Sequence, residues 1–235
     1  MNEQRSKLGP GDFFERIGIL IFLVILVLSV QIPLGVIART RQIKTATILL
    51  GIAYLAIFIV VILIARFFYR RYGKVTPKPF TWADLRLVLI GFVVMLAAEV
   101  ILGMVNQQVY GVQQTSNNEV IAQLLSSNRL TLVLLMISSV CLSPILEELV
   151  FRGFLISSFF DASSRVWPVV VSAVLFAIPH MEDLNIISFL TYASMGAVLA
   201  YLYNHTKNIK VSIALHFLNN LYAMLGMVTL LLTQH

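Results

Sequence analysis

Six polar residues in an apolar chain carry the side chains that could do chemistry. They are Glu147, Glu148, Arg152, His180, His216 and Asn220. Burying an ionised side chain in a low-dielectric region is unfavourable by several kcal/mol unless the charge is paired or hydrated, so such residues are candidates for function. Because polar side chains within lipid must find partners, we expect the six to lie together.

Helical spacing separates the roles of the two carboxylates. Glu148 and Arg152 are four residues apart, so on a helix they share one face, while Glu147 points about a third of a turn away. We expect Arg152 to neutralise Glu148 in a structural ion pair and to leave Glu147 free to face a cavity. Pro144 cannot donate to the carbonyl of Val140, which predicts a kink or local opening beside the carboxylates.

Residue types of this kind suffice for hydrolysis without a covalent intermediate. A carboxylate and a neutral imidazole can hold and deprotonate a water, while a second histidine and an asparagine amide donate hydrogen bonds to the developing oxyanion. Ser143 and Cys141 are close in sequence, but neither stands in a nucleophile-elbow context, which disfavours covalent catalysis. The single cysteine also excludes an intrachain disulfide and a cysteine metal cluster.

The same residues allow other interpretations. Glu147, His180 and His216 could bind zinc, although the chain has no His-Glu-x-x-His helix, which disfavours a metal site. The charges could also form only a paired cluster at a helix end. Glu99, an isolated carboxylate in another apolar segment, could serve a site, stay protonated against a backbone carbonyl or lie near a surface.

The elements that must position these residues are membrane helices. Of the 235 residues, 59% are hydrophobic and 12% are charged, which is more apolar than a soluble domain. The apolar segments are long enough for helices that cross a bilayer and lack the alternation of a membrane barrel. They span residues 17–38, 45–65, 87–105, 130–160, 166–179, 184–204 and 211–233. We therefore expect an all-α, polytopic transmembrane bundle of seven to eight membrane helices. The fourth segment, with Pro144 and Gly153, is long enough to break into two helices.

Basic residues predict the orientation. The first 86 residues hold 12 of the 17 lysines and arginines, beside hydrophobic segments where they set topology and meet lipid headgroups, which argues against a nucleic-acid partner. The densest cluster should face the cytoplasm and comprises Arg66, Arg70, Arg71, Lys74, Lys78 and Arg86. The N-terminus, Lys207 and Lys210 then lie inside and residues 106–129 outside. Arg39, Arg41 and Lys44 would lie outside, against the rule.

Three further features concern packing and connections. Ala193, Gly196 and Ala197 belong to a small-residue face on the sixth segment, which lets a neighbouring backbone come close. Trp82 and Trp167 stand at segment edges, as interfacial anchors do. The polar stretch 106–128 could be a lid, but we favour an ordinary loop.

With these residues assembled, the chain resembles the CAAX prenyl protease and bacteriocin-processing family of membrane proteins, often called the CPBP or Abi family. Three motifs match in order: Glu-Glu-x-x-x-Arg ending at Arg152, Phe-x-x-x-His from Phe176 to His180, and His-x-x-x-Asn from His216 to Asn220. The resemblance covers roughly residues 130–233. We therefore describe one membrane domain with variable helices and basic loops at 1–129 and a family-like core at 130–235.

The resemblance implies a metal-independent, glutamate-dependent intramembrane endopeptidase without a cofactor, in a bacterial cell membrane. Carried over by position, the roles are water activation by Glu147 and His180, an oxyanion hole from His216 and Asn220, and support from Glu148 and Arg152. The partners would be membrane lipid and a peptide or lipidated protein substrate. The family includes both enzymes that cleave prenylated CAAX tails and proteins tied to peptide processing or bacteriocin immunity, so the substrate and the oligomeric state stay open.

Two alternatives come from other functional classes. A non-catalytic immunity factor or scaffold would use the same polar residues to bind a partner or hold the bundle together. A proton-coupled transporter is favoured by the intramembrane carboxylates Glu99 and Glu147, but the chain lacks an internal repeat.

One geometric requirement follows from chain order. His180 ends the fifth segment and His216 lies near the start of the seventh, so full-length straight helices would place them toward opposite faces of the membrane. For the two to meet, the hairpin at His180–Leu184 must be sunk into the membrane, or the neighbouring helices must be short, tilted or broken at Pro179.

Overall fold

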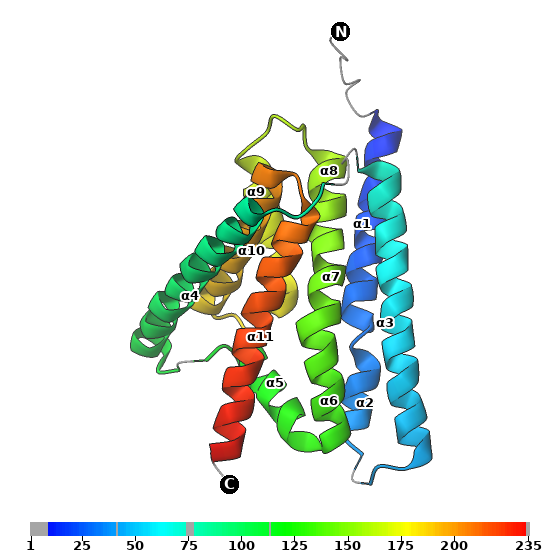
Figure 1. Ribbon diagram of the computed structural model, residues 1–235, viewed down its shortest axis with the longest axis vertical. Helices are drawn as coiled ribbons and strands as arrows, with labels where there is room; N and C mark the ends of the chain where they lie inside the picture. The colour runs from blue at the N-terminus through cyan, green and yellow to red at the C-terminus, as the bar shows by residue number, and fades with distance from the viewer. Residues whose placement is uncertain (1–8, 41, 74–77, 113, 234–235) are drawn as a thin grey trace.

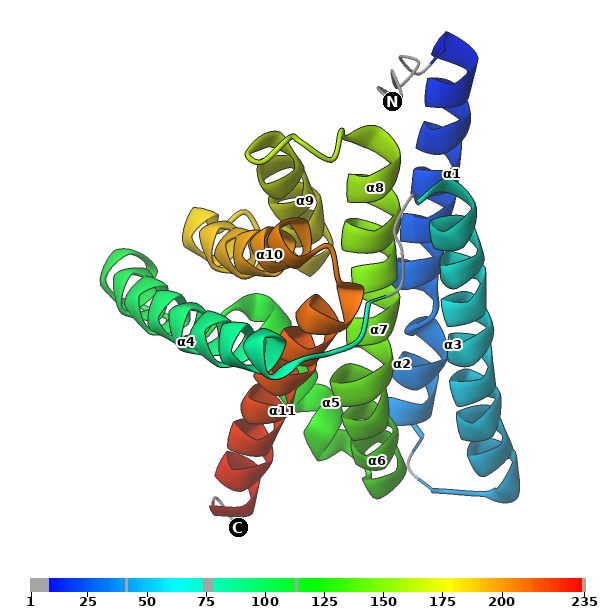
Figure 2. The same ribbon diagram turned by 45° about the horizontal axis from the view of Figure 1, so that its top comes forward.

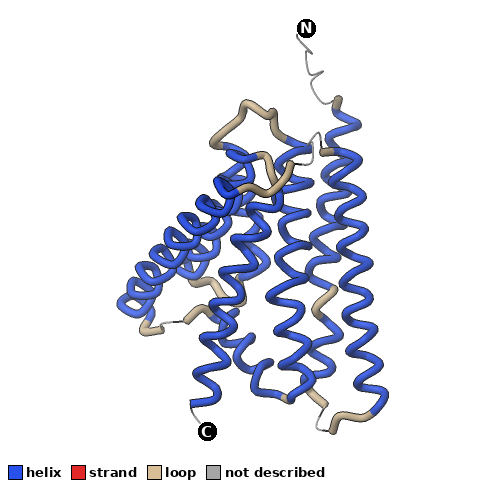
Figure 3. Tube along the Cα trace, in the orientation of Figure 1, coloured by secondary structure: helices blue, strands red, loops and turns tan. Residues whose placement is uncertain are grey.

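A computed structural model describes residues 9–40, 42–73, 78–112 and 114–233 of the protein. Within these ranges the regular structure is helical and contains no strand, as Figure 3 shows. Six helices are long and apolar enough to cross a membrane, and Trp167–His180 forms a shorter apolar helix. The protein is thus an integral, multi-pass membrane protein, and the expectation of a polytopic helical bundle is confirmed.

The N-terminal half contains the first three candidate spans. The first consists of α1 (Pro10–Ser29) and α2 (Ile32–Ala38), separated by a short turn before Pro33. A proline lacks the N–H that would continue the helical ladder, so the chain restarts here with Pro33 in the first turn of α2. Then follow α3 (Thr45–Tyr72) and α4 (Trp82–Tyr110). The start of α4 is fixed by a capping box between Thr81 and Asp84.

The C-terminal half is built around one long helix of changing geometry, Arg129–Phe159. It contains α6 (Arg129–Ile137), a π-helical turn (Ser138–Leu142), α7 (Ser143–Glu148), a second π-helical turn (Leu149–Phe154) and α8 (Leu155–Phe159). The remaining elements are α5 (Ser116–Ser127), α9 (Trp167–Ala177), a 3₁₀ turn (Ile178–His180), α10 (Ile186–Thr206) and α11 (Ile209–Thr233).

The helices form two groups that meet at the long helix. Helices α1, α2 and α3 stand beside α6–α8, while α4 and α10 run obliquely on the other side, with α11 in front (Figure 1). The turned view in Figure 2 shows α4 and α10 lying side by side, and α10 also packs against α9. The segment from α7 to the second π turn is therefore enclosed by elements of both groups.

Large side chains are buried between the helices, and aliphatic side chains are exposed on the outer faces of the bundle. The large side chains without exposed surface include Tyr54, Phe58, Phe154 and Phe176, which lie inside the bundle. The outer faces of α3 and α4 carry exposed aliphatic residues such as Ile52 and Val93, as expected of surfaces that contact lipid. Trp82 and Trp167 are exposed at the first positions of α4 and α9, consistent with the predicted interfacial anchors.

The loop charges that predicted orientation gather at one end of the molecule. Lys78 Nζ donates a hydrogen bond to the Thr206 carbonyl, and Lys210 Nζ donates one to the Lys78 carbonyl. The α3–α4 connection and the α10–α11 connection thus share an end, as Figure 1 shows. Arg41 and Lys74, which belonged to the topology argument, lie outside the described residues.

Candidate active site

The two carboxylates lie on α7, between the π-helical turns of the long helix. The backbone N–H of Ser143 bonds to the carbonyl of Ser138, five residues back, so the wider turn accommodates Pro144, which cannot donate. The second π turn bonds the Leu155 N–H to the Val150 carbonyl in the same way. The helix therefore opens locally, as predicted, but does not break into two helices. A break was a possibility raised by the length of the segment, and the helix avoids it because two wide turns absorb the mismatch without ending the hydrogen-bond ladder.

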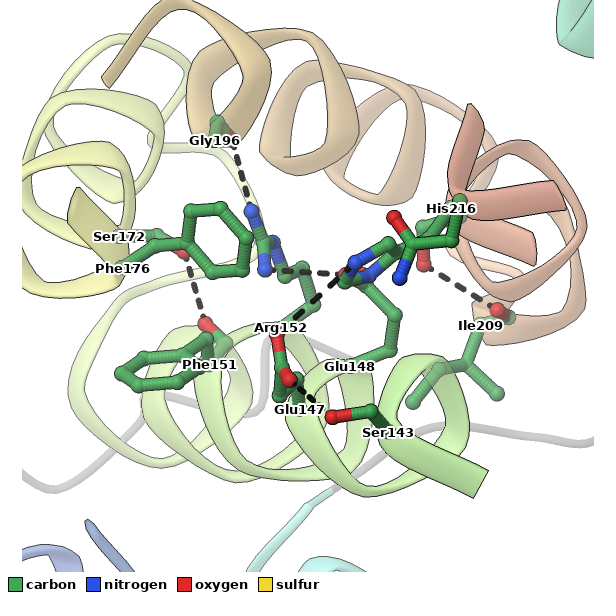
Figure 4. Close-up of polar contacts among 12 residues, drawn as sticks. Ser143, Glu147, Glu148, Phe151, Arg152, Ser172, Phe176, Gly196, Ile209 and His216 are labelled. Carbon is green, nitrogen blue, oxygen red and sulfur yellow. Dashed lines mark hydrogen bonds and ion pairs between the residues drawn. The ribbon is translucent and has the colours of Figure 1, made fainter. Parts of the chain in front are cut away.

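Glu148 and Arg152 form the predicted ion pair deep in the bundle. Glu148 Oε1 lies 2.9 Å from Arg152 Nη1, and neither side chain has exposed surface. Arg152 Nη2 donates to the Gly196 carbonyl at 3.0 Å, and the guanidinium lies 4.4 Å from the centre of the Phe176 ring. Figure 4 shows the guanidinium between these groups. Removing one member of such a pair leaves an uncompensated buried charge, which costs roughly 3–5 kcal/mol.

Gly196 allows α10 to contact Arg152 of the ion pair. A Cβ built on Gly196 would lie 3.0 Å from the Ala173 Cα and 3.1 Å from Phe176 Cδ1. Helices α9 and α10 therefore approach closely only with glycine here, which confirms the packing role predicted for the small-residue face. The close approach brings the Gly196 carbonyl to Arg152.

Glu148 has a second partner that the sequence argument did not assign. Its Oε1 atom lies 3.0 Å from Nδ1 of His216 on α11, which is 3% exposed. An ionised carboxylate only accepts, so Nδ1 carries the proton and the other ring nitrogen, Nε2, faces the opposite way. Glu148 therefore has two roles: it pairs with Arg152, and it sets the tautomer of His216 by accepting the Nδ1–H.

Glu147 faces the imidazole rings of both predicted histidines. Its Oε2 atom lies 4.0 Å from His180 Nε2 and 3.9 Å from His216 Nε2. Its other oxygen, Oε1, accepts a hydrogen bond from Ser143 Oγ one turn earlier on α7 (Figure 4). Distances near 4 Å exceed those of direct hydrogen bonds, but they suit one bridging water molecule.

His180 is held by a carbonyl and by two aromatic rings. Its Nδ1 lies 2.8 Å from the Phe176 carbonyl, so Nδ1–H donates and Nε2 is left for Glu147. The Phe176 ring centre lies 4.7 Å away, and the Tyr192 ring stacks on the other side at 4.8 Å with an interplanar angle of 23°. These contacts fix the ring orientation in the 3₁₀ turn where α9 ends.

A short α9 explains how His180 and His216 meet despite their separation along the chain. The helical segment Trp167–His180 is about 20 Å long at 1.5 Å per residue, less than the roughly 30 Å of a hydrocarbon core. His216 lies about 10 Å along α11 from Ile209 by the same measure. Both elements start from the same end of the bundle (Figure 1), and the Nε2 atoms of the two rings lie 4.0 and 3.9 Å from Glu147 Oε2. The predicted requirement for a short helix is met.

The expectation of an ordinary loop at residues 106–128 was wrong. Helix α4 continues to Tyr110, and a further helix, α5, starts at Ser116 with Thr115 as its N-cap. Thr115 Oγ1 lies 2.7 Å from the Tyr192 hydroxyl, and Asn117 Nδ2 donates to the same hydroxyl at 3.1 Å. A helix in this polar stretch therefore contacts the ring that stacks on His180.

Asn220 lies one turn after His216 on α11. Its Nδ2 donates to the Ser139 carbonyl at 2.8 Å, in the first π turn of the long helix. A primary amide has two N–H donors, so one remains for another acceptor. The π turn supplies this contact because its wide geometry leaves a carbonyl turned away from the helical ladder.

The proposed catalytic side chains line one cavity of about 570 Å³. Among its lining residues are Glu147, His180, His216 and Asn220, together with apolar side chains from α1, α2, α5 and α11. Glu148 and Arg152 lie behind this wall. The structure thus brings together all six residues singled out from the sequence; their roles remain predictions.

Several other polar residues of the cavity wall had no such signal. Tyr192, Thr115 and Asn117 belong to no motif of polar residues at helical spacing. Contacts between elements distant in sequence bring them to His180. Asn219 and Glu99 also line the cavity. For these two the signal was present, because both are polar residues in apolar spans, and the structure places Glu99 on the cavity wall.

The residue types at the site include zinc ligands, so metal binding was considered. Within the described ranges, no group of three histidine, cysteine, aspartate or glutamate side chains is arranged to hold a metal ion. Glu147 Oε2 and the two Nε2 atoms nevertheless converge on one point of the cavity.

Comparisons with known proteins fall on the same part of the chain. Residues 129–222 match the family model described as type II CAAX prenyl endopeptidase Rce1-like. The putative membrane peptidase YdiL of Bacillus subtilis is 26% identical over 175 residues, covering 74% of this chain and 69% of the relative. The membrane-embedded CAAX protease MroQ of Staphylococcus aureus is 29% identical over 138 residues, covering 56% of this chain and 53% of that protein. No solved structure matches the chain significantly.

The range that matches the family model, residues 129–222, includes all residues of the three motifs. The fold brings these motifs together around one cavity. The matched range spans Glu147 on α7, His180 after α9 and Asn220 on α11. Two curated relatives named as a membrane peptidase and a CAAX protease agree with it. Residues 129–222 of the chain are therefore similar to the Rce1-like type II CAAX prenyl endopeptidases, in agreement with the resemblance carried by its three motifs.

Proposed function

We propose that the protein is an intramembrane endopeptidase in which Glu147 and His180 activate a water molecule that attacks a peptide bond. The substrate would be a membrane-associated peptide or a lipidated protein. The observation that carries the proposal is the position of Glu147 Oε2, 4.0 and 3.9 Å from the Nε2 atoms of two histidines in one cavity. Three groups at this spacing can share one water molecule.

The first step is addition of water to the substrate carbonyl. Glu147, assisted by His180, takes a proton as the water oxygen bonds to the carbonyl carbon. The carbonyl oxygen gains the negative charge of the tetrahedral intermediate. The second N–H of Asn220 and the Nε2 side of His216 are suited to stabilise this charge. The C–N bond then breaks, the proton passes to the leaving amine, and a carboxylate and an amine are released.

His216 needs a second proton for its part in this scheme. Its Nδ1–H is donated to Glu148, so a neutral ring has only a lone pair at Nε2. Donation to an oxyanion therefore requires the imidazolium form. The carboxylates of Glu147 and Glu148 lie on either side of the ring.

The test is turnover by the Glu147→Gln variant in proteoliposomes, with a peptide library as substrate and products identified by mass spectrometry. We expect kcat to fall by about 10²–10⁴-fold, the range for loss of a general base. Glu119→Gln is the matched control, because Glu119 is exposed on α5 and does not line the cavity. Undiminished turnover by a folded Glu147→Gln protein would contradict water activation by this residue.

The non-catalytic alternative makes the opposite prediction. An immunity factor or scaffold would keep its biological effect in a bacteriocin-sensitivity assay after Glu147→Gln, since the substitution preserves shape. A transporter would show solute uptake into proteoliposomes that depends on Glu99. Loss of the biological effect together with loss of cleavage supports the protease.

Metal independence is a separate part of the proposal. We expect purified protein to keep full turnover after chelation with 1,10-phenanthroline and to contain less than stoichiometric zinc by elemental analysis. Loss of activity on chelation that zinc restores would instead assign Glu147 and the two histidines to a metal centre.

A further inference from the structure

Acidic side chains outnumber lysine and arginine on the cavity wall. The carboxyl groups of Glu99, Glu147 and Glu182 line it, whereas the lining residues within the described part of the chain include no lysine or arginine. Arg152 is fully buried behind the wall, where Glu148 pairs with it. Away from His180 and His216, a cationic group of a substrate would therefore find acidic partners on this wall.

One of these carboxylates belongs to a polar pair separate from the catalytic set. Glu99 on α4 and Asn219 on α11 are neighbours where the two helices pack together. Asn219 is 3% exposed, and its Oδ1 is a buried acceptor without a hydrogen-bond partner among the described residues. Oε1 of Glu99 is likewise buried and unpartnered within those residues. Both side chains line the cavity.

The pair lies one side chain away from the proposed catalytic histidine. Glu99 and Tyr192 line the same cavity, and the Tyr192 ring stacks on His180 at 4.8 Å. A group held by Glu99 would therefore belong to a substrate whose peptide bond lies beside Glu147. This proximity distinguishes a substrate subsite from an unrelated buried carboxylate.

Two buried acceptors side by side define the chemistry of the missing partner. Buried polar groups are normally hydrogen-bonded, and the amide oxygen and the carboxylate oxygen can be satisfied only by a donor. A positively charged donor fits best, because its charge also meets the carboxylate and charge-assisted hydrogen bonds are the strong ones. We propose that Glu99 and Asn219 form a subsite for a positively charged lysine side chain or amine of the peptide substrate. The proposal rests on the proposed protease function, since it names the substrate class of the same cavity.

Binding tests the subsite without requiring turnover. Fluorescein-labelled decapeptides of alanine and leucine, with a single lysine moved through each position, are titrated by anisotropy against the Glu147→Gln variant in detergent. Peptides with norleucine in place of lysine are the reference, because norleucine keeps the chain but loses the ammonium. At one or two positions we expect lysine to bind about tenfold more tightly than norleucine. A difference below twofold at every position would overturn the subsite.

Variants then assign the preference to residues. Adding Glu99→Gln to the Glu147→Gln background should abolish the lysine preference, whereas Glu182→Gln should keep it, because Glu182 is exposed and screened by solvent. Asn219→Asp should increase the lysine preference, because it adds a second carboxylate to the subsite. This variant keeps the size of the side chain, so it can be tested even if a larger change at Asn219 prevents folding. If Glu99 is instead protonated and donates a hydrogen bond to Asn219, the Glu99→Gln protein will show the same lysine preference as its Glu147→Gln parent. That result would contradict the proposal.

Turnover separates this inference from the proposed function. With Glu147 intact, Glu99→Gln should lower kcat/KM for the preferred lysine peptide about tenfold and leave the norleucine peptide within twofold. Glu147-dependent cleavage without any lysine preference would contradict the subsite and leave the protease standing. Lysine-selective binding without cleavage of any peptide would contradict the protease and leave the subsite standing.

Discussion

At the scale of single residues, adjacent glutamates differ because the helix points them in different directions. Glu148 forms an ion pair with Arg152 and accepts from His216 with no exposed surface, whereas Glu147 reaches the cavity and is 8% exposed. The spacing of Glu148 and Arg152 was enough to predict their pair. The contact of Glu148 with His216 was not predictable, because it joins α7 to α11 across 68 residues of sequence.

The ion pair makes a prediction about stability. Arg152→Met should lower the free energy of unfolding by about 3–5 kcal/mol, because it leaves Glu148 charged and buried without its partner. The double variant Glu148→Leu/Arg152→Met should recover most of this loss, since a buried pair can be replaced by apolar residues. Thermal unfolding in detergent measures both variants.

The same double variant separates stability from positioning. It should remain inactive, because His216 loses the acceptor that fixes its Nδ1–H. Recovered stability with recovered turnover would show that Glu148 has no role beyond the ion pair.

At the scale of elements, irregular segments position the site. Two π turns flank α7, a 3₁₀ turn carries His180, and α5 contacts Tyr192. The length and apolar composition of the segments predicted the long helices. They indicated neither the π turns nor α5, because these depend on how a whole helix fits its neighbours.

Tyr192 should act as a positioning residue for His180. Tyr192→Phe keeps the ring and removes the hydroxyl contacts with Thr115 and Asn117, so we expect kcat to fall about twofold to fivefold. Tyr192→Ala removes the stacking and should lower kcat at least about tenfold, with a smaller change in KM. Steady-state kinetics of the two variants measure this split. An unchanged kcat for Tyr192→Ala would show that the stack does not orient His180.

Gly196 offers a test of helix packing. In Gly196→Ala the new Cβ would press on the Ala173 backbone and on Phe176, so α10 must move away from α9 and from Arg152. We expect a loss of about 1–3 kcal/mol in unfolding free energy and a lower kcat. Gly226→Ala is the control, because nothing lies within 4 Å of a Cβ built there. Equal stability of the two variants would contradict the close α9–α10 contact.

At the scale of the whole molecule, composition and segment length were enough to predict the helical bundle. Each of the seven apolar segments has a helical counterpart in the structure, from Pro10–Ala38 to Ile209–Thr233. The way the helices pack was not predictable from composition, because apolar faces alone do not specify which helices meet. His180 and His216 lie close together because the helix Trp167–His180 is short, and composition did not predict this.

The orientation in the membrane is a proposal at this scale. We propose that the end with the α3–α4 and α10–α11 connections faces the cytoplasm, following the basic residues Arg70, Arg71 and Lys210. In a cysteine-free background, Phe80→Cys should react with an impermeant maleimide only after cell lysis, whereas Ile43→Cys should react in intact cells. Both side chains are exposed. The reverse labelling pattern would invert the topology.

The central claim is the division of labour between Glu147 and Glu148, and one paired measurement tests it most directly. Turnover and thermal unfolding are measured in parallel for Glu147→Gln and Glu148→Gln. The account predicts that Glu147→Gln loses about 10²–10⁴-fold in kcat while its unfolding temperature stays close to that of the unsubstituted protein, because Ser143 is the single hydrogen-bond donor to Glu147 among the described residues. Glu148→Gln should lower the unfolding temperature as well as kcat, because Arg152 and His216 both depend on that carboxylate. Full turnover by Glu147→Gln, or an equal loss of stability in both variants, would contradict the account.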